Sequence, residues 1–503
     1  MPVSTDVLDV APSLRDALEV RVVAHDDPLD GVEAVSIPVT TEEVPPVLGV
    51  DHEGLRRAGF TPTVGKALAF PGTGVPVLVA VGVGELHGLD SAAVRDAAAA
   101  FAAAVPFDGH LATRVPWSER MSLAESAAAI VEGVLLARYR FSLRSTETGP
   151  VKIASLTLVA PEGEMEAVEE GAARGRVLAR AAMVSRDLAT CPAGLLTASA
   201  MADLAVALGP DAGVEVEVFG KAELEQMGCG GLLGVNRGSE QPPRMIRMTY
   251  SPPGEPTGHL GLVGKGIMYD SGGINLKPSD VSHSQMKNDM SGAGAILAAM
   301  TALREVGCPA RVTAYLMCTD NMPSGSAMQL GDVLVTRNGT TVEVMNTDAE
   351  GRLVMCDALA LCVEDGVDAI VDIATLTGAC LRALGTEVAG VMGNSRAVLD
   401  GVKAAASKTD EPVWELPLIR RYRSQLDSTI ADMTNLGGPN AGSITAGLYL
   451  EEFVAGTPWA HIDIAGTAQV EVATRWIPKG PTGFGARLLV ELARAFTAPQ
   501  PAE

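Results

Sequence analysis

Apolar and polar residues in the first third of the chain follow the spacing of strands and helices in turn. Residues 18–23 alternate apolar and charged side chains as a half-buried strand does, and residues 75–83 form a nearly continuous apolar run typical of a buried strand. Residues 92–104 and 123–137 are rich in alanine and contain no proline, which predicts helices. Strands that alternate with helices predict a smaller N-terminal α/β domain over residues 1–165.

A long helical segment separates this domain from the rest of the chain. Residues 162–190 hold few helix breakers and many Ala, Glu and Arg. Pro192 ends the pattern, because proline disfavours helix in the residue before it. We therefore expect a linker helix over residues 166–190, with the domain boundary near residue 165.

The remaining two-thirds of the chain repeats a strand-then-helix rhythm. The expected strands are residues 260–264, 311–318, 369–373 and 460–464. The expected helices are residues 293–305, 353–364, 442–454 and 484–496. This rhythm predicts a larger α/β domain over residues 191–503, with a central mixed, largely parallel sheet covered by helices on both faces. Loops at the carboxyl ends of such strands are where these folds place their chemistry.

Charge and cysteine content narrow the class of protein. The 503 residues include 38 Lys and Arg against 61 Asp and Glu, and the net charge of −23 disfavours general binding to nucleic acid or anionic membranes. The seven cysteines form no CxxC pair, as is usual in reduced cytosolic proteins. Residues 1–20 carry no secretory signal, and the longest stretch of small apolar residues, 97–105, is too short to span a bilayer. We expect a cytoplasmic protein without a membrane partner.

The octapeptide Asn-Thr-Asp-Ala-Glu-Gly-Arg-Leu at residues 346–353 concentrates charge among small residues. In an extended segment successive side chains point to opposite sides, so Asp348, Glu350 and Arg352 would share one side. The alternative is a capping box that opens the following helix, with Thr347 as N-cap and Glu350 three residues later.

Two further loops carry charged side chains beside predicted elements. Residues 263–273 follow a predicted strand, are dense in glycine and include Lys265 and Asp270, and Lys277 comes shortly afterwards. The alternative for this loop is a flexible turn with an exposed lysine. Asp289 precedes a predicted helix, where an ordinary aspartate stabilised by the helix dipole is the alternative.

Together the three loops present four acids, which would repel one another unless cations lie among them. Oxygen-rich sites of this kind suit Mg²⁺, Mn²⁺ or Zn²⁺. Four carboxylates are enough to hold two metals about 3.5–4 Å apart, the spacing that activates water for hydrolysis. The sequence therefore predicts a two-metal hydrolase.

Several of these segments resemble the signatures of the leucyl aminopeptidases, the cytosol aminopeptidase family of dinuclear metallopeptidases. The octapeptide matches the family signature in full. The other similar segments are residues 263–277, 286–292, 321–325, 374–379 and 460–466. The strong resemblance covers about residues 170–495, and the N-terminal domain resembles the family's more variable domain loosely.

The resemblance implies a cofactor of two divalent metal ions per subunit, Mn²⁺ or Zn²⁺. Asp270 and Glu350 would bridge both ions. Lys265 and Asp289 would complete one site, and Asp348 the other. A lysine binds metal only as a neutral amine, and a neighbouring dication lowers its pKa accordingly.

The resemblance also implies two catalytic side chains. Lys277 would polarise the substrate carbonyl and hold the developing oxyanion, and must stay charged to do so. Arg352 would bind bicarbonate, which serves as general base, and its bidentate fork suits a planar anion. With Glu350 committed to metal, we expect the helix to begin at or after residue 351.

Substrate and partners follow from the same resemblance. The residues that would line the pocket for the first side chain are Met286, Asn346, Thr375 and Ala465. Such a pocket is apolar and adaptable, which favours Leu or Met, although core packing is the alternative for Met286. The family also implies a homohexamer whose active sites face an interior cavity.

The expected function is thus a cytosolic, metal-dependent leucyl aminopeptidase that removes N-terminal residues from peptides. One alternative is an additional DNA-binding regulatory role, which the acidic charge and the lack of a DNA-binding motif oppose. The other is a catalytically silent relative, although all seven key positions are present. The histidines form no HExxH spacing, and we expect His461 to be a core residue and the cysteines to be buried.

Overall fold

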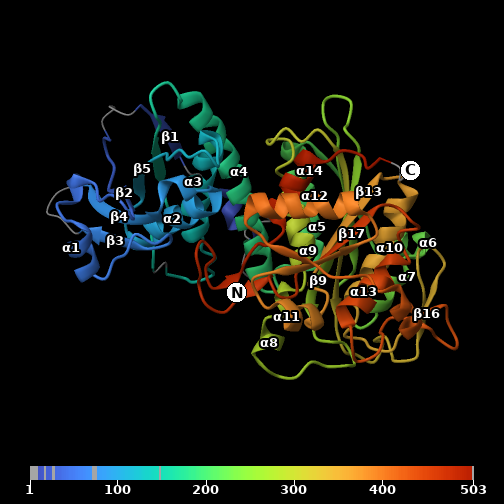
Figure 1. Ribbon diagram of the computed structural model, residues 1–503. Coiled ribbons are helices and arrows are strands. Elements are labelled where there is room, and N and C mark those ends of the chain that lie inside the picture. The colour runs from blue at the N-terminus through green and yellow to red at the C-terminus, as the bar shows by residue number, and fades with distance from the viewer. Residues whose placement is uncertain (1–9, 16–18, 25–28, 71–75, 147–148, 501–503) are drawn as a thin grey trace. The chain divides into compact units, whose positions relative to one another are not determined.

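The computed structural model describes residues 10–15, 19–24, 29–70, 76–146 and 149–500 (Figure 1). Contacts divide the chain into two compact units. The smaller unit consists of Arg15–Met183 and Glu471–Gly480, and the larger one of Val184–Val470 with the described residues before Arg15 and after Gly480. Within the described ranges, no helix combines the length and the apolar composition that crossing a membrane requires.

The smaller unit is built on a six-stranded sheet of order β1-β6-β5-β2-β4-β3, parallel except for β3 against β4. Its strands are β1 Glu19–Val23, β2 Ala34–Thr40, β3 Ala67–Phe70, β4 Val77–Gly84, β5 His110–Arg114 and β6 Ser155–Val159. Its helices include α1 His52–Arg57, α2 Ser91–Ala104 and α3 Leu123–Ala137. Both strands and both helices predicted here are confirmed; residues 18 and 75 lie outside the described ranges.

A single 26-residue helix, α4 Met165–Thr190, follows β6 in the chain. The sequence places the domain boundary near residue 165, whereas the contacts divide the chain between Met183 and Val184, inside α4. The physical reason is packing: a Cβ at Gly171 would lie 2.1 Å from the carbonyl oxygen of Ala124 on α3. The glycine lets the first part of α4 lie against α3, so this part of the helix belongs to the smaller unit.

The larger unit contains an eight-stranded mixed sheet of order β15-β14-β17-β13-β9-β10-β8-β7. Its central strands, β17-β13-β9-β10, are parallel, as the sequence predicts, whereas β8 against β10, β7 against β8 and β14 against β17 are antiparallel. The strands are β7 Val214–Phe219, β8 Arg244–Tyr250, β9 His259–Asp270, β10 Arg311–Asn321, β13 Ala369–Ala374, β14 Ala389–Gly393, β15 Val413–Glu415 and β17 Trp459–Asp463.

Helices cover both faces of this sheet (Figure 1). One face carries α6 Lys221–Met227, α7 Gly230–Asn236, α10 Gly351–Glu364 and α13 Gly442–Glu451, which share a buried apolar cluster with the strands. The other carries α5 Ala198–Ala212, α9 Ser291–Met300, α12 Arg396–Thr409 and α14 Ala486–Ala495. Shorter elements are α8 Val281–Ser284, α11 Gly378–Leu384, β11 Val333–Val335, β12 Thr341–Glu343, β16 Met433–Thr434, β18 Gln469–Val470 and β19 Gly480–Pro481. The two-domain α/β fold is confirmed.

The strand β9 is much longer than the sequence predicts. The expected loop over residues 263–273 is strand as far as Asp270, so the prediction of a glycine-rich loop was wrong. Its glycines mark close packing: a Cβ at Gly264 would lie 2.8 Å from Ala293 Cα, and one at Gly266 would lie 2.8 Å from the carbonyl oxygen of Met317. Glycine here lets a helix and a neighbouring strand approach the backbone.

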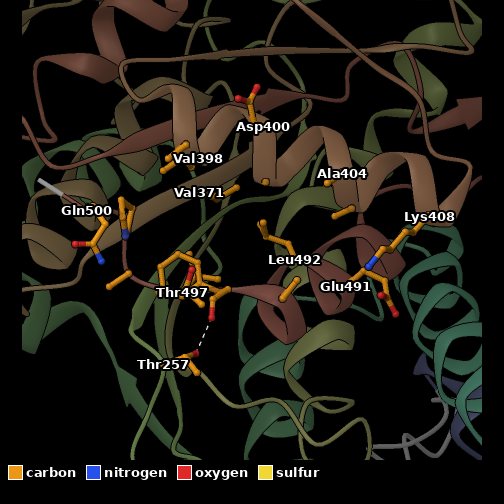
Figure 2. A pocket seen from close by; sticks show the side chains of 18 residues that line it. Thr257, Val371, Val398, Asp400, Ala404, Lys408, Glu491, Leu492, Thr497 and Gln500 are labelled. Atoms are coloured by element: carbon orange, nitrogen blue, oxygen red, sulfur yellow. Dashed lines mark hydrogen bonds between the residues drawn. The ribbon is translucent and has the colours of Figure 1, made fainter. Parts of the chain in front are cut away.

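A cavity of about 630 Å³ lies between α12, α14 and the amino-terminal part of β9 (Figure 2). Its lining is mainly apolar, including Leu260, Val371 and Leu492. It contains none of the residues singled out above for metal or substrate binding, which gather toward the carboxyl ends of the strands.

Candidate metal centre

Lys265 on β9 is enclosed by three acceptors. Its Nζ lies 2.8 Å from Asp289 Oδ2 and 2.9 Å from Glu350 Oε1. It also donates a hydrogen bond of 2.8 Å to the carbonyl oxygen of Thr375. Asp289 precedes α9, Glu350 precedes α10 and Thr375 follows β13, so three connections of the sheet meet at one amine.

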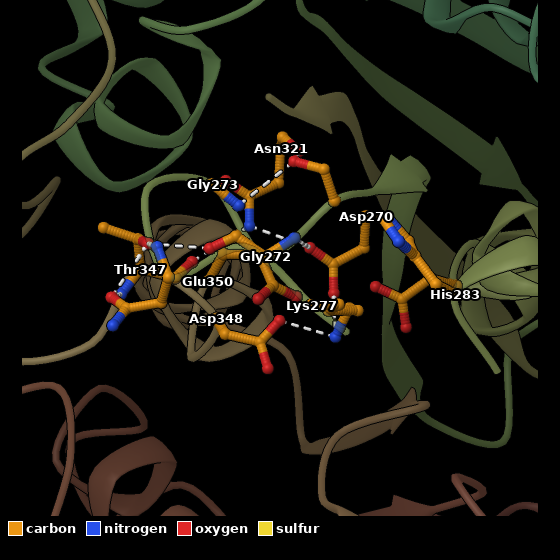
Figure 3. A network of polar contacts seen from close by, with 12 residues as sticks. Asp270, Gly272, Gly273, Lys277, His283, Asn321, Thr347, Asp348 and Glu350 are labelled. Atoms are coloured by element: carbon orange, nitrogen blue, oxygen red, sulfur yellow. Dashed lines mark hydrogen bonds and ion pairs between the residues drawn. The ribbon is translucent and has the colours of Figure 1, made fainter. Parts of the chain in front are cut away.

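A second lysine joins the two remaining acids (Figure 3). Lys277 Nζ lies 2.8 Å from Asp270 Oδ2 and 2.5 Å from Asp348 Oδ1. Asp270 is the last residue of β9 and is buried, whereas the Asp348 side chain is 34% exposed. Lys277 therefore lies toward the open side of the cluster, where a substrate can reach it.

The structure brings together all the acids predicted from the three loops. One carboxylate oxygen from each of Asp270, Asp289 and Glu350 lies within 4.8 Å of the others. Asp348 is tied to this group through Lys277. The elements that carry these side chains start or end at the carboxyl edge of the central strands, as parallel α/β topology dictates.

The pKa values in the cluster are shifted by burial, by neighbouring carboxylates and by the lysines. Burial raises the pKa of Asp289 well above its ordinary value, against the lowering effect of Lys265. Burial and the charge of Glu350 likewise raise the pKa of Asp348. Burial alone would lower the pKa of Lys265, but the surrounding carboxylates, Asp289 first among them, raise it overall. The site thus holds an excess of anionic groups that favours a cation.

The residues fit a divalent metal centre. Glu350 Oε2 is buried and accepts no hydrogen bond from the described residues, and the ion pair with the Lys265 amine is the contact that Asp289 Oδ2 makes within that part of the chain. A buried carboxylate oxygen without donors is costly unless a cation compensates it. Carboxylates with one amine form a donor set suited to Mn²⁺ or Zn²⁺.

The octapeptide is a turn followed by a helix, so the expectation of an extended segment was wrong. The Ala349 amide donates to the carbonyl oxygen of Asn346 at 3.3 Å, and α10 begins at Gly351. The capping-box alternative is excluded, because Glu350 is itself the N-cap residue and no side chain caps the helix. Thr347 Oγ1 instead donates to the carbonyl oxygen of Gly272 at 2.7 Å. The predicted helix start is confirmed.

Gly351 has a role that the sequence did not reveal. A Cβ at this position would lie 2.7 Å from Lys265 Cδ and 2.9 Å from Lys265 Nζ. The lysine side chain passes directly over the first turn of α10, and any Cβ at this position would force it to shift. The glycine between Glu350 and Arg352 therefore lets the Lys265 side chain from β9 keep its observed position.

Arg352 lies in the first turn of α10 and is 5% exposed. Its Nε and Nη1 atoms are buried without hydrogen-bond partners among the described residues. Burial lowers the pKa of the guanidinium, while Tyr449 and Glu350 raise it. Buried guanidinium donors without acceptors indicate a place for an anion.

Two of the four residues expected to line the substrate pocket make hydrogen bonds to acidic residues of the cluster. Thr375 Oγ1 donates to Asp289 Oδ1 at 2.6 Å, and Asn346 Oδ1 accepts from the Asp348 amide at 2.7 Å. Both side chains therefore hold acidic residues of the cluster. Met286 is half-buried in the 3-10 helix Met286–Asn288, and Ala465 follows β17.

Two buried amides support the site and were missed as functional residues. Asn321 Nδ2 donates to Asp270 Oδ1 at 2.8 Å. Asn435 Nδ2 donates to the carbonyl oxygen of Asn346 at 2.7 Å, and its Oδ1 accepts from the Met345 amide at 2.8 Å. Asn321 begins a segment already noted for its resemblance, whereas Asn435 carries no sequence signal.

Outside the cluster, His461 is fully buried on β17, where its Nδ1 meets Asp372 Oδ1 at 2.5 Å. The seven cysteines are all buried and free, so their predicted burial is confirmed.

Comparison with known proteins decides the family. A model described as "Cytosol aminopeptidase family, catalytic domain" matches residues 183–490, and the model of the same family's N-terminal domain matches residues 52–146. The chain belongs to the cytosol aminopeptidase family. Family membership makes it an aminopeptidase of a metal-binding class, and the resemblance drawn from the motifs is confirmed.

Members of the cytosol aminopeptidase family from several bacteria are similar over most of their length. A probable cytosol aminopeptidase of Chlorobium limicola is 44% identical over 391 residues, which cover 76% of this chain and 77% of the relative. One from Synechococcus sp. is 40% identical over 449 residues, covering 87% and 88%. The solved structure of the bottromycin maturation enzyme BotP in complex with Mn matches with a TM-score of 0.84 and 38% identity over 92% of this chain and 99% of that one.

Proposed function

We propose that this chain is a leucyl aminopeptidase that uses two divalent ions, Mn²⁺ or Zn²⁺, to remove Leu and other apolar residues from the N-termini of peptides. The observation that carries the proposal is the convergence of Asp270, Asp289 and Glu350, whose ligand oxygens lie within 4.8 Å of one another around Lys265. The family and the Mn-bound solved structure support divalent metal as the cofactor.

Five side chains would hold the two ions. Asp270 and Glu350 would contact both, Lys265 and Asp289 one, and Asp348 the other. Lys265 would act as a neutral amine and so has to lose the proton that its carboxylate partners favour. When bound, the ions supply a Lewis acid for the peptide carbonyl and lower the pKa of water.

Lys277 would hold the oxygen of the scissile carbonyl as negative charge develops on it. Its ammonium group is kept charged by Asp270 and Asp348, which raise its pKa against the opposing effect of burial. The side chain is 19% exposed, so it can meet a substrate without leaving its partners. A fixed cation at this place stabilises the transition state more than the ground state.

Arg352 would hold bicarbonate through its unpartnered Nε and Nη1 donors. Bicarbonate supplies a general base when it is bound. The planar guanidinium fork matches a planar carbonate anion, which a lysine could not bind in two places.

The substrate's first side chain would lie near Met286 and Ala465, beside Thr375 and Asn346. Met286 is half-buried and lies three residues before the proposed ligand Asp289, and thioether side chains adapt to apolar groups of different shape. This supports a preference for Leu or Met over charged residues.

The chain is further proposed to work as a cytoplasmic homohexamer. Exposed apolar side chains on and beside the small sheet β11-β12-β16 support an interface there; they are Leu330, Val333, Val335 and Ile430. Light scattering after size exclusion tests this, with the mass of six chains expected and the mass of one chain as the contrary result.

The function is tested by a metal-dependent activity profile. Protein stripped with a chelator should not hydrolyse leucine p-nitroanilide, and Mn²⁺ or Zn²⁺ should restore turnover. Leucine and methionine substrates should then exceed aspartate and lysine substrates in kcat/KM. Full activity in protein shown by elemental analysis to be free of metal would refute the proposal.

A further inference from the structure

Asn321 ends β10 beside Asp270, the last residue of β9 (Figure 3). The two strands pair in parallel, and their register shifts between Thr319 and Asn321 so that Asn321 stands opposite Asp270. The side chain is 2% exposed. An irregularity in the sheet thus places a buried amide against a carboxylate of the candidate metal centre.

Both hydrogens of the Asn321 amide are used. Nδ2 lies 2.8 Å from Asp270 Oδ1 and 2.9 Å from the carbonyl oxygen of Thr347. An amide nitrogen has two donors and no acceptor capacity, so it satisfies both oxygens at once. One side chain therefore ties the end of β9 to the turn that carries Asp348 and Glu350.

The two oxygens of Asp270 have different partners as a result. Oδ1 accepts from Asn321 Nδ2 and from the Gly272 amide at 2.9 Å. Oδ2 faces Lys277 Nζ at 2.8 Å. Neutral protein donors hold Oδ1, which leaves Oδ2 as the oxygen directed at the charged groups of the site.

The Asn321 backbone also holds the chain that follows Asp270. Its carbonyl oxygen accepts from the Ser271 amide at 3.0 Å and from Ser271 Oγ at 2.7 Å. These two contacts do not depend on the side chain, so a substitution at Asn321 keeps them and removes only the contacts of the amide.

We propose that Asn321 is a positioning residue of the metal centre, which sets the orientation of the Asp270 carboxylate and its spacing from the Asp348–Glu350 turn. This inference rests on the proposed function, because it concerns the ligands of the same two ions. Side chains that orient metal ligands typically change metal affinity about 10–100-fold when they are removed.

The test compares Asn321→Leu with Asn236→Leu. The first variant keeps the approximate volume and removes both donors. Asn236 is the matched control: its buried Nδ2 also makes two hydrogen bonds, to the carbonyl oxygen of Gln241 and to Thr319 Oγ1 on β10, each 2.9 Å, and neither of these partners is a carboxylate. Both substitutions remove buried hydrogen bonds near β10, but only the one at Asn321 removes a hydrogen bond to a proposed metal ligand, Asp270.

Binding of Mn²⁺ alone is measured from the EPR signal of the free aqua ion, with circular dichroism as the check of folding. Asn321→Leu should weaken Mn²⁺ binding about tenfold or more, and Asn236→Leu should leave it unchanged. Asn321→Ser, which has one short donor and cannot reach both oxygens, should weaken it in the same direction and serves if the leucine variant does not fold.

The outcomes separate this inference from the proposed function. Wild-type affinity in a folded Asn321 variant overturns the positioning role while leaving the two-metal proposal intact. Equal weakening in the Asn236 variant also overturns it, since the effect would then be one of general packing. A wild-type protein that binds no Mn²⁺ or Zn²⁺ refutes the proposed function itself.

Discussion

Thr375 Oγ1 donates a hydrogen bond of 2.6 Å to Asp289 Oδ1, and the carbonyl oxygen of the same threonine accepts from Lys265 Nζ at 2.8 Å. One residue at the end of β13 therefore holds two proposed ligands of one metal, one through its side chain and one through its backbone. A residue expected to line the substrate pocket therefore contacts two side chains of the candidate metal centre.

Thr375→Val should weaken metal binding without unfolding the protein. Valine keeps the shape and the backbone carbonyl, but leaves Asp289 Oδ1 without its donor. We expect about a tenfold higher Mn²⁺ concentration for half-maximal activity. Thr375→Ser keeps the hydroxyl and should behave as the wild type. If the valine variant changed only the KM for leucine substrates, Thr375 would be a pocket residue alone.

Gly351→Ala should impair activity although alanine is the better helix former by about 1 kcal/mol. The new Cβ would stand 2.7 Å from Lys265 Cδ, so the lysine side chain has to shift from its position between Asp289 and Glu350. We expect turnover at saturating Mn²⁺ to fall at least about tenfold, which corresponds to about 1.4 kcal/mol.

The control for this change is Gly401→Ala in α12. A Cβ there would lie 3.5 Å from Leu492 Cδ1, an ordinary contact. Its turnover should equal that of the wild type. Wild-type turnover in the Gly351 variant would mean that activity does not depend on the observed position of the Lys265 side chain.

Asp357 on α10 should make stability depend on pH. It is fully buried, and burial raises its pKa to about 7 despite the amides of Leu232 and Arg337 that donate to it at 2.9 Å. Its pKa in the folded state is therefore above that in the unfolded chain, about 3.9. Between these values the folded state binds the extra proton, so stability falls as pH rises, by at most about 1.4 kcal/mol per pH unit.

Urea unfolding of metal-free protein at pH 5, 6 and 7 measures this effect against Asp357→Asn. The asparagine variant has no proton to bind there, so its midpoint should fall less steeply between pH 5 and 7. Parallel midpoints for the two proteins over this range would show that Asp357 is ionised throughout.

Strong apolar patterns made much of the fold predictable from the sequence. The buried strands β10, β13 and β17 and the helix α10 lie where their apolar runs place them. The continuation of β9 beyond Gly264, through Gly266 to Asp270, was not predictable, because glycine favours turns locally. Here the close approach of Ala293 and Met317 requires it. Tertiary packing overrides local preference at these positions.

The sequence made it possible to predict which charged residues form the candidate site. It did not make it possible to predict how they are arranged. The turn at Thr347 is fixed by Asn275, whose amide and Oδ1 bond the Thr347 Oγ1 and amide at 2.9 Å each. Those partners are 72 residues apart, and no local pattern encodes the contact. The roles of Asn321 and Gly351 are hidden in the same way, because their partners Asp270 and Lys265 are also far from them in sequence.

The most direct test of the account is the metal content of active protein. Wild-type protein loaded with Mn²⁺, dialysed and analysed by inductively coupled plasma mass spectrometry should hold two ions per chain, and Glu350→Gln, which alters a proposed bridging ligand, should hold fewer and turn over far more slowly. Full leucine aminopeptidase activity with one ion or none per chain would contradict the two-metal site built from Lys265, Asp270, Asp289, Asp348 and Glu350.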